Sequence, residues 1–297
     1  MDLYITFSII AIGALVAGSA GMVGSFLILR RMAMLGDAIS HAVLPGIAIA
    51  FLLTHSRSPL VMVIGAAVFG LVTAWLVQTL QRAGVQEDAG IGVTFTALFA
   101  IGVVLIALFA GRVHLDLEHV LYGEIAYAPW DQWIVGGLNL GPRALWTMGA
   151  IFLIDLAVIT LFFKELKLCA FDPSTAAALG INVTLFHYLL MTLVSITTVG
   201  AFDSVGAILV VAMLVVPGAT AYLLTERLST MLALAVAQGA LSSLLGYFLA
   251  RVTDSSIAAA MSTVSGFLFL LAFLLAPGTG LIARLIQRRR SLPVSSR

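Results

Sequence analysis

Long apolar runs alternate with short polar junctions along this chain. Nine of the runs are long enough to cross roughly 30 Å of hydrocarbon as helices that rise about 1.5 Å per residue. The pattern therefore predicts an all-α, polytopic membrane protein that forms one transmembrane domain over residues 1–297. The predicted spans are residues 5–29, 33–53, 59–80, 91–111, 144–163, 185–202, 204–224, 230–250 and 256–276.

Two stretches leave the path of the chain open. The junction at 200–206, Gly-Ala-Phe-Asp-Ser-Val-Gly, is either a tight turn between two spans or a break within a re-entrant element. Residues 112–143 are too polar to span, and we expect a short interfacial helix and a loop there.

Composition supports the membrane assignment. Of the 297 residues, 61% are apolar and 10% are charged, whereas a soluble domain carries about 25% charged residues. The net charge of +1 gives no reason to expect nucleic-acid binding. The single cysteine, Cys169, excludes a disulfide within the chain and a cysteine-based zinc site. The first residues lack the basic segment and cleavage site of a signal peptide, so we expect the first run to be retained as a span.

The distribution of basic residues orients the predicted spans, because cytoplasmic loops carry an excess of lysine and arginine. With nine spans, the better arrangement places the N-terminus outside and the C-terminus, with its basic tail 284–297, inside. The cytoplasmic segments then hold eleven basic residues: Arg30, Arg31, Arg82, Lys164, Lys167, Arg227, Arg284, Arg288, Arg289, Arg290 and Arg297. The outer segments hold four: Arg57, Arg112, Arg143 and Arg251.

An aspartate and a histidine interrupt the second apolar run, in the segment Gly-Asp-Ala-Ile-Ser-His-Ala-Val-Leu-Pro-Gly at 36–46. Asp37 and His41 are four residues apart, and residues at that spacing lie on one face of a helix. Ionisable side chains within a bilayer are unfavourable and mark functional sites. We interpret the pair as a binding site for a metal ion that crosses the membrane. A carboxylate with one imidazole suits Mn(II) or Fe(II), and Zn(II) also binds such a set.

Each member of the pair also has a simpler interpretation. Asp37 would cap a helix that starts at Ala38, and a lone histidine often forms a hydrogen bond between helices. Pro45, one turn after His41, kinks a helix and frees a carbonyl at that level. The kink either serves packing alone or marks a helix that lines the ion path, since irregular backbone at membrane depth faces protein or water.

The longest connection on the cytoplasmic side, roughly 164–184, contains signals for a short helix. Asp172 suits the N-cap, Pro173 the first helical position and Gly180 the stop after an alanine-rich body. Two turns are too short to be stable alone, so the helix must pack against something. It is either an ordinary interfacial helix or a coupling helix that docks on a cytoplasmic partner.

Other polar residues are secondary candidates. The cluster His114, Asp116, Glu118 and His119 lies on the outer side and is either a solvated polar face or a region for partner docking or metal admission. Asp203 is hydrated if the 200–206 junction is an outer turn, and a further ligand or gate if the junction is buried. Asp155 has no ligand-type neighbour one turn away, so we expect it to hydrogen-bond to adjacent helices. His187 needs no special role near the end of a span.

Four motifs give the chain a family resemblance. They are residues 36–46, residues 114–123 (His-Leu-Asp-Leu-Glu-His-Val-Leu-Tyr-Gly), Ala-Phe-Asp-Pro at 170–173 with Ala-Leu-Gly at 178–180, and residues 205–217 (Val-Gly-Ala-Ile-Leu-Val-Val-Ala-Met-Leu-Val-Val-Pro). In these motifs and nearly end to end, the chain resembles the permease subunits of bacterial ABC importers for manganese, zinc and iron(II), the metal-chelate-type (ABC-3) family. The resemblance implies a type II importer permease in the bacterial inner membrane.

The resemblance also implies partners and roles. It implies a homodimer, or in some systems a heterodimer of similar permeases, above two cytoplasmic ATPase subunits, with an extracytoplasmic protein that delivers the metal. The family's metal pair falls on Asp37 and His41. Its ATPase-contacting helix falls on the segment that contains Phe171, Asp172, Pro173, Ala178, Leu179 and Gly180. The implied mechanism is ATP-driven alternating access, with Mn(II) favoured as cargo, Fe(II) or Zn(II) as alternatives, and no covalently bound cofactor.

The chain cannot bind ATP through a phosphate-binding loop. A phosphate-binding loop ends in Gly-Lys-Ser or Gly-Lys-Thr, and neither Lys164 nor Lys167, the only lysines, follows a glycine. We therefore expect a transport subunit rather than an enzyme. A proton-coupled secondary metal transporter also explains an aspartate and a histidine within the membrane. An intramembrane hydrolase is disfavoured, because the only nearby nucleophile, Ser40, points away from both side chains on a regular helix.

Overall fold

The structure is a computed structural model that describes residues 2–55, 59–109, 125–135, 138–276 and 280–281. Its elements are α1 (Asp2–Leu29), α2 (Ala33–Thr54), α3 (Pro59–Arg82), α4 (Glu87–Phe109), the 3₁₀ helix η1 (Ala128–Trp130), β1 (Gln132–Val135), β2 (Leu138–Pro142), α6 (Arg143–Leu161), α7 (Phe163–Phe171), α8 (Pro173–Ala178), α9 (Val183–Leu224), α10 (Leu228–Thr253) and α11 (Ile257–Leu275). The predicted all-α class is confirmed, with one small hairpin added.

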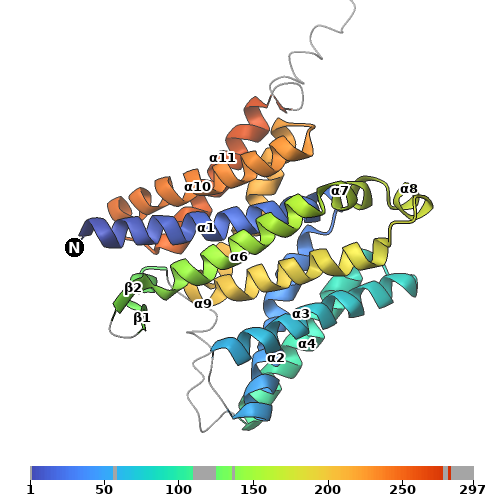
Figure 1. Cartoon of the computed structure of the whole chain (residues 1–297), viewed down its shortest axis with the longest axis horizontal. Helices are drawn as coiled ribbons and strands as arrows, with labels where there is room; N and C mark the ends of the chain where they lie inside the picture. Colours follow the sequence, from blue (N-terminus) through green and yellow to red (C-terminus); the bar gives the residue numbers. More distant parts are fainter. Residues whose placement is uncertain (1, 56–58, 110–124, 136–137, 277–279, 282–297) are drawn as a thin grey trace, which may run out of the picture.

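Nine helical segments in the described ranges are long and apolar enough to cross a membrane. Each lies within a few residues of a predicted span, and α9 supplies two of them, Val183–Phe202 and Ser204–Leu224. In Figure 1, α1, α6, α10 and the first part of α9 run side by side, while α2, α3 and α4 form a second group. The short helices α7 and α8 lie at one end of the molecule and the hairpin at the other.

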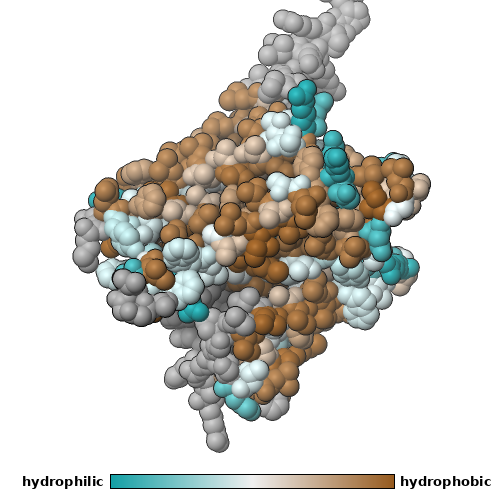
Figure 2. Space-filling view, in the orientation of Figure 1, coloured by the Kyte–Doolittle hydropathy of each residue, from teal (hydrophilic) through white to brown (hydrophobic). Residues whose placement is uncertain are grey.

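Apolar residues cover most of the face shown in Figure 2, as expected for helices whose outer surface meets lipid. Polar residues gather toward the end that carries α7 and α8. On this face, the middle of the molecule is therefore apolar and the end that carries α7 and α8 is more polar.

The first helix lies at the centre of the bundle, where it contacts α6, α9 and α10. Its side chains Ile12, Val16, Val23 and Phe26 are completely buried. Gly24 allows α9 to approach closely, since a side-chain carbon added there would overlap the backbone of Leu214. Close approach through glycine is a common way to pack helices in membranes, where dispersion contacts replace the hydrophobic effect.

The junction at 200–206 is a break within one long helical run. The run extends from Val183 to Leu224 as α9, but inside it Gly206 has φ 76° and ψ 168°, a conformation that is open mainly to glycine. Its neighbours Ala201 and Val205 are completely buried. The junction is therefore a buried kink between two span-length segments, Val183–Phe202 and Ser204–Leu224. It is neither an exposed turn nor a break within a re-entrant element.

The segment 112–143 differs partly from the prediction. Where the sequence predicts an interfacial helix and a loop, the described part contains η1 and an antiparallel β1–β2 hairpin that pairs Val135 with Leu138 and Gln132 with Pro142. Trp133 and Trp146 pack edge to face, 6.3 Å apart, and join the hairpin to α6. The alternation of polar and apolar residues over such short strands is too weak a signal to predict them.

Candidate metal site

The helix that carries the predicted pair begins before it, not at it. Met32 is the N-cap of α2, and the helix runs from Ala33 to Thr54. Asp37 is thus the fifth residue of the helix, and its carboxylate is not the cap of a helix that starts at Ala38. The capping alternative for Asp37 is excluded.

Asp37 and His41 lie together on α2, as the spacing predicts. His41 Nε2 is 3.6 Å from Asp37 Oδ1. Metal bonds to oxygen and nitrogen of about 2.0–2.2 Å place two ligand atoms up to about 4 Å apart, so one ion reaches both atoms. The distance between the two atoms therefore fits a divalent cation. The two side chains supply only part of its coordination shell, and other ligands must complete it.

The pair occupies the open stripe of an otherwise buried helical segment. The His41 and Asp37 side chains are 32% and 38% exposed, whereas their neighbours Ala38, Ile39 and Ala42 are almost completely buried. About a third of each side chain is therefore open to space that water, an ion or another chain can occupy.

Two aromatic rings from α4 orient the imidazole. Phe95 lies 5.1 Å and Phe99 lies 5.7 Å from the His41 ring, centroid to centroid. Ser40, between Asp37 and His41 in the sequence, donates to the backbone carbonyl oxygens of Gly36 and Asp37 at 3.1 and 2.8 Å. Its hydroxyl is therefore engaged with the helix itself, in agreement with the prediction that it points away from the pair.

Pro45 lies inside α2 and changes the backbone at His41. Proline has no N–H, so the carbonyl of His41, four residues earlier, lacks its usual helical hydrogen bond. A side-chain carbon at Gly102 of α4 would lie 2.8 Å from the Pro45 ring, so glycine there lets α4 pack against the kink. His41 thus combines an imidazole with a carbonyl that receives no hydrogen bond from residue 45.

No cluster of three or more His, Cys, Asp or Glu side chains occurs among the described residues. In that part of the chain, Asp37 and His41 therefore have no third side chain of these types beside them. The range 110–124 includes His114, Asp116, Glu118 and His119, which lie outside the described residues.

The remaining acidic candidates have different surroundings. The backbone of Asp203 lies in α9, three residues before Gly206. Asp155 in α6 is completely buried, and its Oδ2 accepts a hydrogen bond of 2.7 Å from the Thr197 hydroxyl of α9. The prediction that Asp155 bonds to a neighbouring helix is confirmed.

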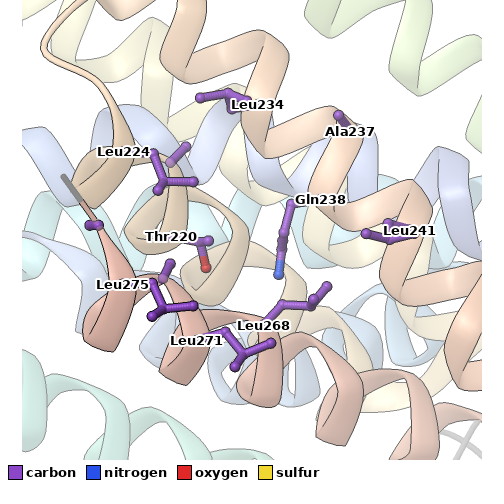
Figure 3. A pocket seen from close by; sticks show the side chains of 12 residues that line it. Thr220, Leu224, Leu234, Ala237, Gln238, Leu241, Leu268, Leu271 and Leu275 are labelled. Carbon is purple, nitrogen blue, oxygen red and sulfur yellow. The ribbon is translucent and has the colours of Figure 1, made fainter. Parts of the chain in front are cut away.

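A separate cavity of about 410 Å³ lies between α9, α10 and α11. Figure 3 shows leucine side chains around it, with Thr220 and Gln238 as its polar groups. Gln238 Nε2 donates to Ser265 Oγ at 3.1 Å. Among the residues described around this cavity there is no carboxylate or imidazole, so it does not have the ligands of a metal site.

The predicted short helix is present as α8, and its cap is the predicted one. Asp172 accepts hydrogen bonds from the Ser174 hydroxyl at 2.5 Å and from the Thr175 hydroxyl and N–H at 2.5 and 3.0 Å. These bonds, first that from Ser174, lower the pKa of the Asp172 carboxyl to about 2. Gly180 ends the segment with φ 81°. The cap of α8 is therefore an ionised, locally satisfied carboxylate.

Two exposed apolar side chains flank α8. Phe171 is 56% and Leu179 is 68% exposed, although both lie in a polar end of the molecule. Exposed apolar groups of this kind suit contact with a partner. The sequence does not predict α7, the preceding helix, whose Leu166 and Cys169 are buried against the bundle.

Sequence reasoning missed a contact near the start of α2. Arg30 donates to His187 Nδ1 at 3.2 Å and to the Cys169 carbonyl oxygen at 3.4 Å. His187, for which the sequence predicts no role, is therefore part of a half-buried network. The partners are 139 and 157 residues from Arg30 along the chain, so no local pattern could have indicated the contact.

The fold and the site define a polytopic helical membrane protein with an acid–imidazole pair among its spans. The family model of the ABC 3 transport family matches residues 2–276. The chain belongs to this family and is a membrane-spanning permease subunit of an ABC transporter.

Relatives match over nearly the full length. The chain is 51% identical to the manganese transport system membrane protein MntD of Bacillus subtilis, over 94% of this chain and 95% of MntD. It is 43% identical to the zinc transport system membrane protein TroD of Treponema pallidum, over 96% of this chain and 77% of TroD. Among solved structures, PsaBC from Streptococcus pneumoniae in complex with Fab has a TM-score of 0.77 at 34% identity, over 95% of this chain and 94% of that one.

Proposed function

We propose that this permease imports divalent metal ions, with Mn(II) as the preferred cargo, in a complex driven by ATP. The observation that carries the proposal is the Asp37–His41 pair, 3.6 Å apart on the open stripe of α2. A carboxylate with an imidazole suits Mn(II), Fe(II) and Zn(II). The names of relatives, manganese for MntD and zinc for TroD, support a cargo within that group.

Asp37 and His41 bind the ion during its passage, and a second copy of the chain completes the path. Two side chains are too few for a divalent ion, and a transport site benefits from an open shell because it must release its cargo. The exposed position of the pair supports a contact with another permease. A two-fold axis near α2 would bring four side chains around one ion.

Energy enters through the short helix α8. ATPase subunits on the cytoplasmic side bind the segment that contains Phe171, Asp172, Pro173, Ala178, Leu179 and Gly180. The exposed Phe171 and Leu179 support this role, because they present apolar surface at the polar end of the molecule. ATP-driven closure of those subunits moves α8 and exchanges the inner and outer gates.

The rest of the arrangement follows from the direction of transport. The chain lies in the bacterial inner membrane with its N-terminus outside and its tail 284–297 inside. An extracytoplasmic binding protein delivers the metal to the outer side, where the cluster of His114, Asp116, Glu118 and His119 assists docking or admission. Asp203 is a lower-ranked third ligand or gate. The permease domain comprises residues 1–297.

The test is metal uptake by the complete importer in proteoliposomes, with Asp37→Ala and His41→Ala variants. Each variant assembles with its partners and fails to take up ⁵⁴Mn(II), a loss larger than the about 10–100-fold that outer-shell changes cause. Ser40→Ala is the matched control, since its hydroxyl bonds only to backbone carbonyls. Competition by Fe(II) and Zn(II) ranks the cargo.

Two results would overturn the proposal. Normal uptake by both variants would remove the site assignment. Uptake by the permease in vesicles without ATPase subunits would indicate a secondary carrier driven by an ion gradient.

A further inference from the structure

A half-buried cation lies where α1 ends, and its partners come from two other helices. Arg30 Nη1 donates to His187 Nδ1 of α9 at 3.2 Å, and Nη2 donates to the carbonyl oxygen of Cys169 in α7 at 3.4 Å. Within the described residues no carboxylate lies within ion-pair distance of this guanidinium. A charged group removed from water requires hydrogen bonds, so these two neutral acceptors hold Arg30 in place. Figure 1 shows the end of α1 beside α7.

The His187 ring is specialised for this contact. A guanidinium has only donors, so His187 Nδ1 must accept and the ring hydrogen lies on Nε2. The ring is buried, at 8% exposure, and Nε2 has no hydrogen-bond partner among the described residues. The contact with Arg30 is therefore the main polar interaction of this imidazole in that part of the structure.

On one side, Arg30 is joined rigidly to the helix of the metal pair. Only three residues separate α1 from α2, and the corner is closed by hydrogen bonds from Arg31 N to Ile28 O at 3.0 Å and from Met32 N to Leu27 O at 2.9 Å. Arg31 adopts φ 62° to make this corner. A displacement of Arg30 therefore moves the start of α2, and Asp37 follows two turns later.

On the other side, the Cys169 carbonyl belongs to the elbow that holds α8. Cys169 is buried in α7, and the N–H of Asp172 donates to the Leu168 carbonyl at 2.9 Å. Asp172 then caps α8. Two residues thus separate Cys169, whose carbonyl accepts from Arg30, from the N-cap Asp172.

We infer that Arg30 is a positioning residue that transmits motion of the α7–α8 elbow to α2, through its bonds to the Cys169 carbonyl and His187. This inference rests on the proposed function, because it links the ATPase-contacting segment to the metal pair. When α8 moves, the elbow displaces the guanidinium, and the closed α1–α2 corner turns the helix that carries Asp37 and His41. Without the contact, the ATPase subunits still hydrolyse ATP, but less metal is imported for each ATP hydrolysed.

The experiment measures metal imported per ATP hydrolysed, in proteoliposomes that hold the complete importer. Arg30→Met removes every donor, and Arg30→Lys keeps the charge but loses the two-armed geometry. Arg31→Gln is the matched control, since Arg31 is the exposed neighbour. His187→Leu removes the acceptor, whereas His187→Gln supplies another. Assembly with the ATPase is measured for every variant by size-exclusion chromatography.

Arg30→Met and His187→Leu are expected to lower the ratio at least about tenfold, the factor that corresponds to one lost hydrogen bond to a charged group. ATP hydrolysis continues in both, Arg30→Lys is intermediate, and His187→Gln and Arg31→Gln keep the ratio near wild type. Equal losses of import and ATP hydrolysis, an unchanged ratio, or failure of all Arg30 and His187 variants to assemble would overturn the inference and leave a structural role.

The outcome is separable from that of the proposed function. Mn(II) binding by the assembled complex is measured as a second readout. Asp37→Ala and His41→Ala are expected to lose this binding, whereas Arg30→Met leaves it unchanged. If Asp37→Ala imports normally while Arg30→Met lowers the ratio, the coupling role stands and the site assignment does not. The reverse pattern overturns only the coupling role.

Discussion

Asp37 on α2 and Asp172 at the cap of α8 use the same functional group in opposite ways. Asp172 receives three hydrogen bonds, all from the next three residues. Asp37 has His41 as its polar side-chain partner in the described structure, at a distance of 3.6 Å. One carboxylate is saturated by its own turn, and the other retains unused lone pairs beside an imidazole.

This difference indicates how to separate a structural carboxylate from a binding one. A cap that satisfies itself stabilises a helix and needs no ligand. An unsaturated carboxylate within a membrane-spanning segment is unfavourable unless a cation or water completes it. The same Asp→Asn substitution should therefore have different results at different sites, which provides a direct test of the comparison.

The largest effect is expected from Asp37→Asn. The amide keeps the volume of the side chain but removes the charge that a divalent ion requires, so Mn(II) uptake falls at least about 100-fold, beyond the usual effect of an outer-shell change. The measurement is initial ⁵⁴Mn(II) uptake per assembled complex. Near-normal uptake by Asp37→Asn would show that the charge of Asp37 is not needed for transport, and Asp37 would then not differ from the capping residue Asp172.

An effect of intermediate size is expected at Asp155, a buried carboxylate that accepts a hydrogen bond from a neighbouring helix. Asp155→Leu leaves the Thr197 hydroxyl without its partner, which lowers the free energy of unfolding by about 1–3 kcal/mol. Asp155→Asn retains an acceptor for Thr197 and has a smaller effect. Thermal unfolding in detergent measures both.

Uptake per folded molecule serves as the control for Asp155. It should remain normal in Asp155→Asn. A stable Asp155→Asn protein without uptake would place Asp155 with Asp37 in the ion path rather than with the structural carboxylates.

The smallest effect is expected from Asp172→Asn, because asparagine is also a good N-cap. Asp172→Ala removes the cap and reduces uptake partially. The pKa of Asp172 lies at about 2 in the folded protein, below its ordinary 3.8, because the hydrogen bonds favour the ionised form. Its contribution to stability is therefore fully present above about pH 4 and is lost as the pH falls toward about 2.

The titration of Asp172 can be followed by NMR of the labelled carboxyl carbon. A midpoint near the ordinary value would show that the cap is not formed. A large loss of uptake in Asp172→Asn would mean that the charge itself contacts the ATPase, and the cap would then resemble the metal pair in needing a partner.

Sequence reasoning succeeded where the physical cause is local. The lengths of the apolar runs predicted the nine spans, because membrane thickness sets the helix length. The i, i+4 spacing placed Asp37 beside His41, and Asp172, Pro173 and Gly180 predicted α8. Each prediction depends on residues within one or two helical turns.

It failed where neighbours are distant or the signal is weak. The β1–β2 hairpin has strands of four and five residues, too short for a clear alternation. The helix α7 has only nine residues, and its Leu166 and Cys169 are buried against the bundle, so it depends on distant packing rather than on a local signal. For Asp37, His41 and α8, local patterns left alternatives open, and the metal-binding and coupling roles that the family resemblance implies stay predictions.

The class of protein, the nine spans among the described residues, the proximity of Asp37 to His41 and the capped helix all follow from the sequence alone, because hydropathy and helical spacing act over short distances. The packed structure was needed to show that Asp37 lies inside its helix, that Gly206 forms a buried kink, and that Arg30 meets Cys169 and His187. These features depend on which distant surfaces pack together, and packing is set by the whole bundle rather than by any one segment.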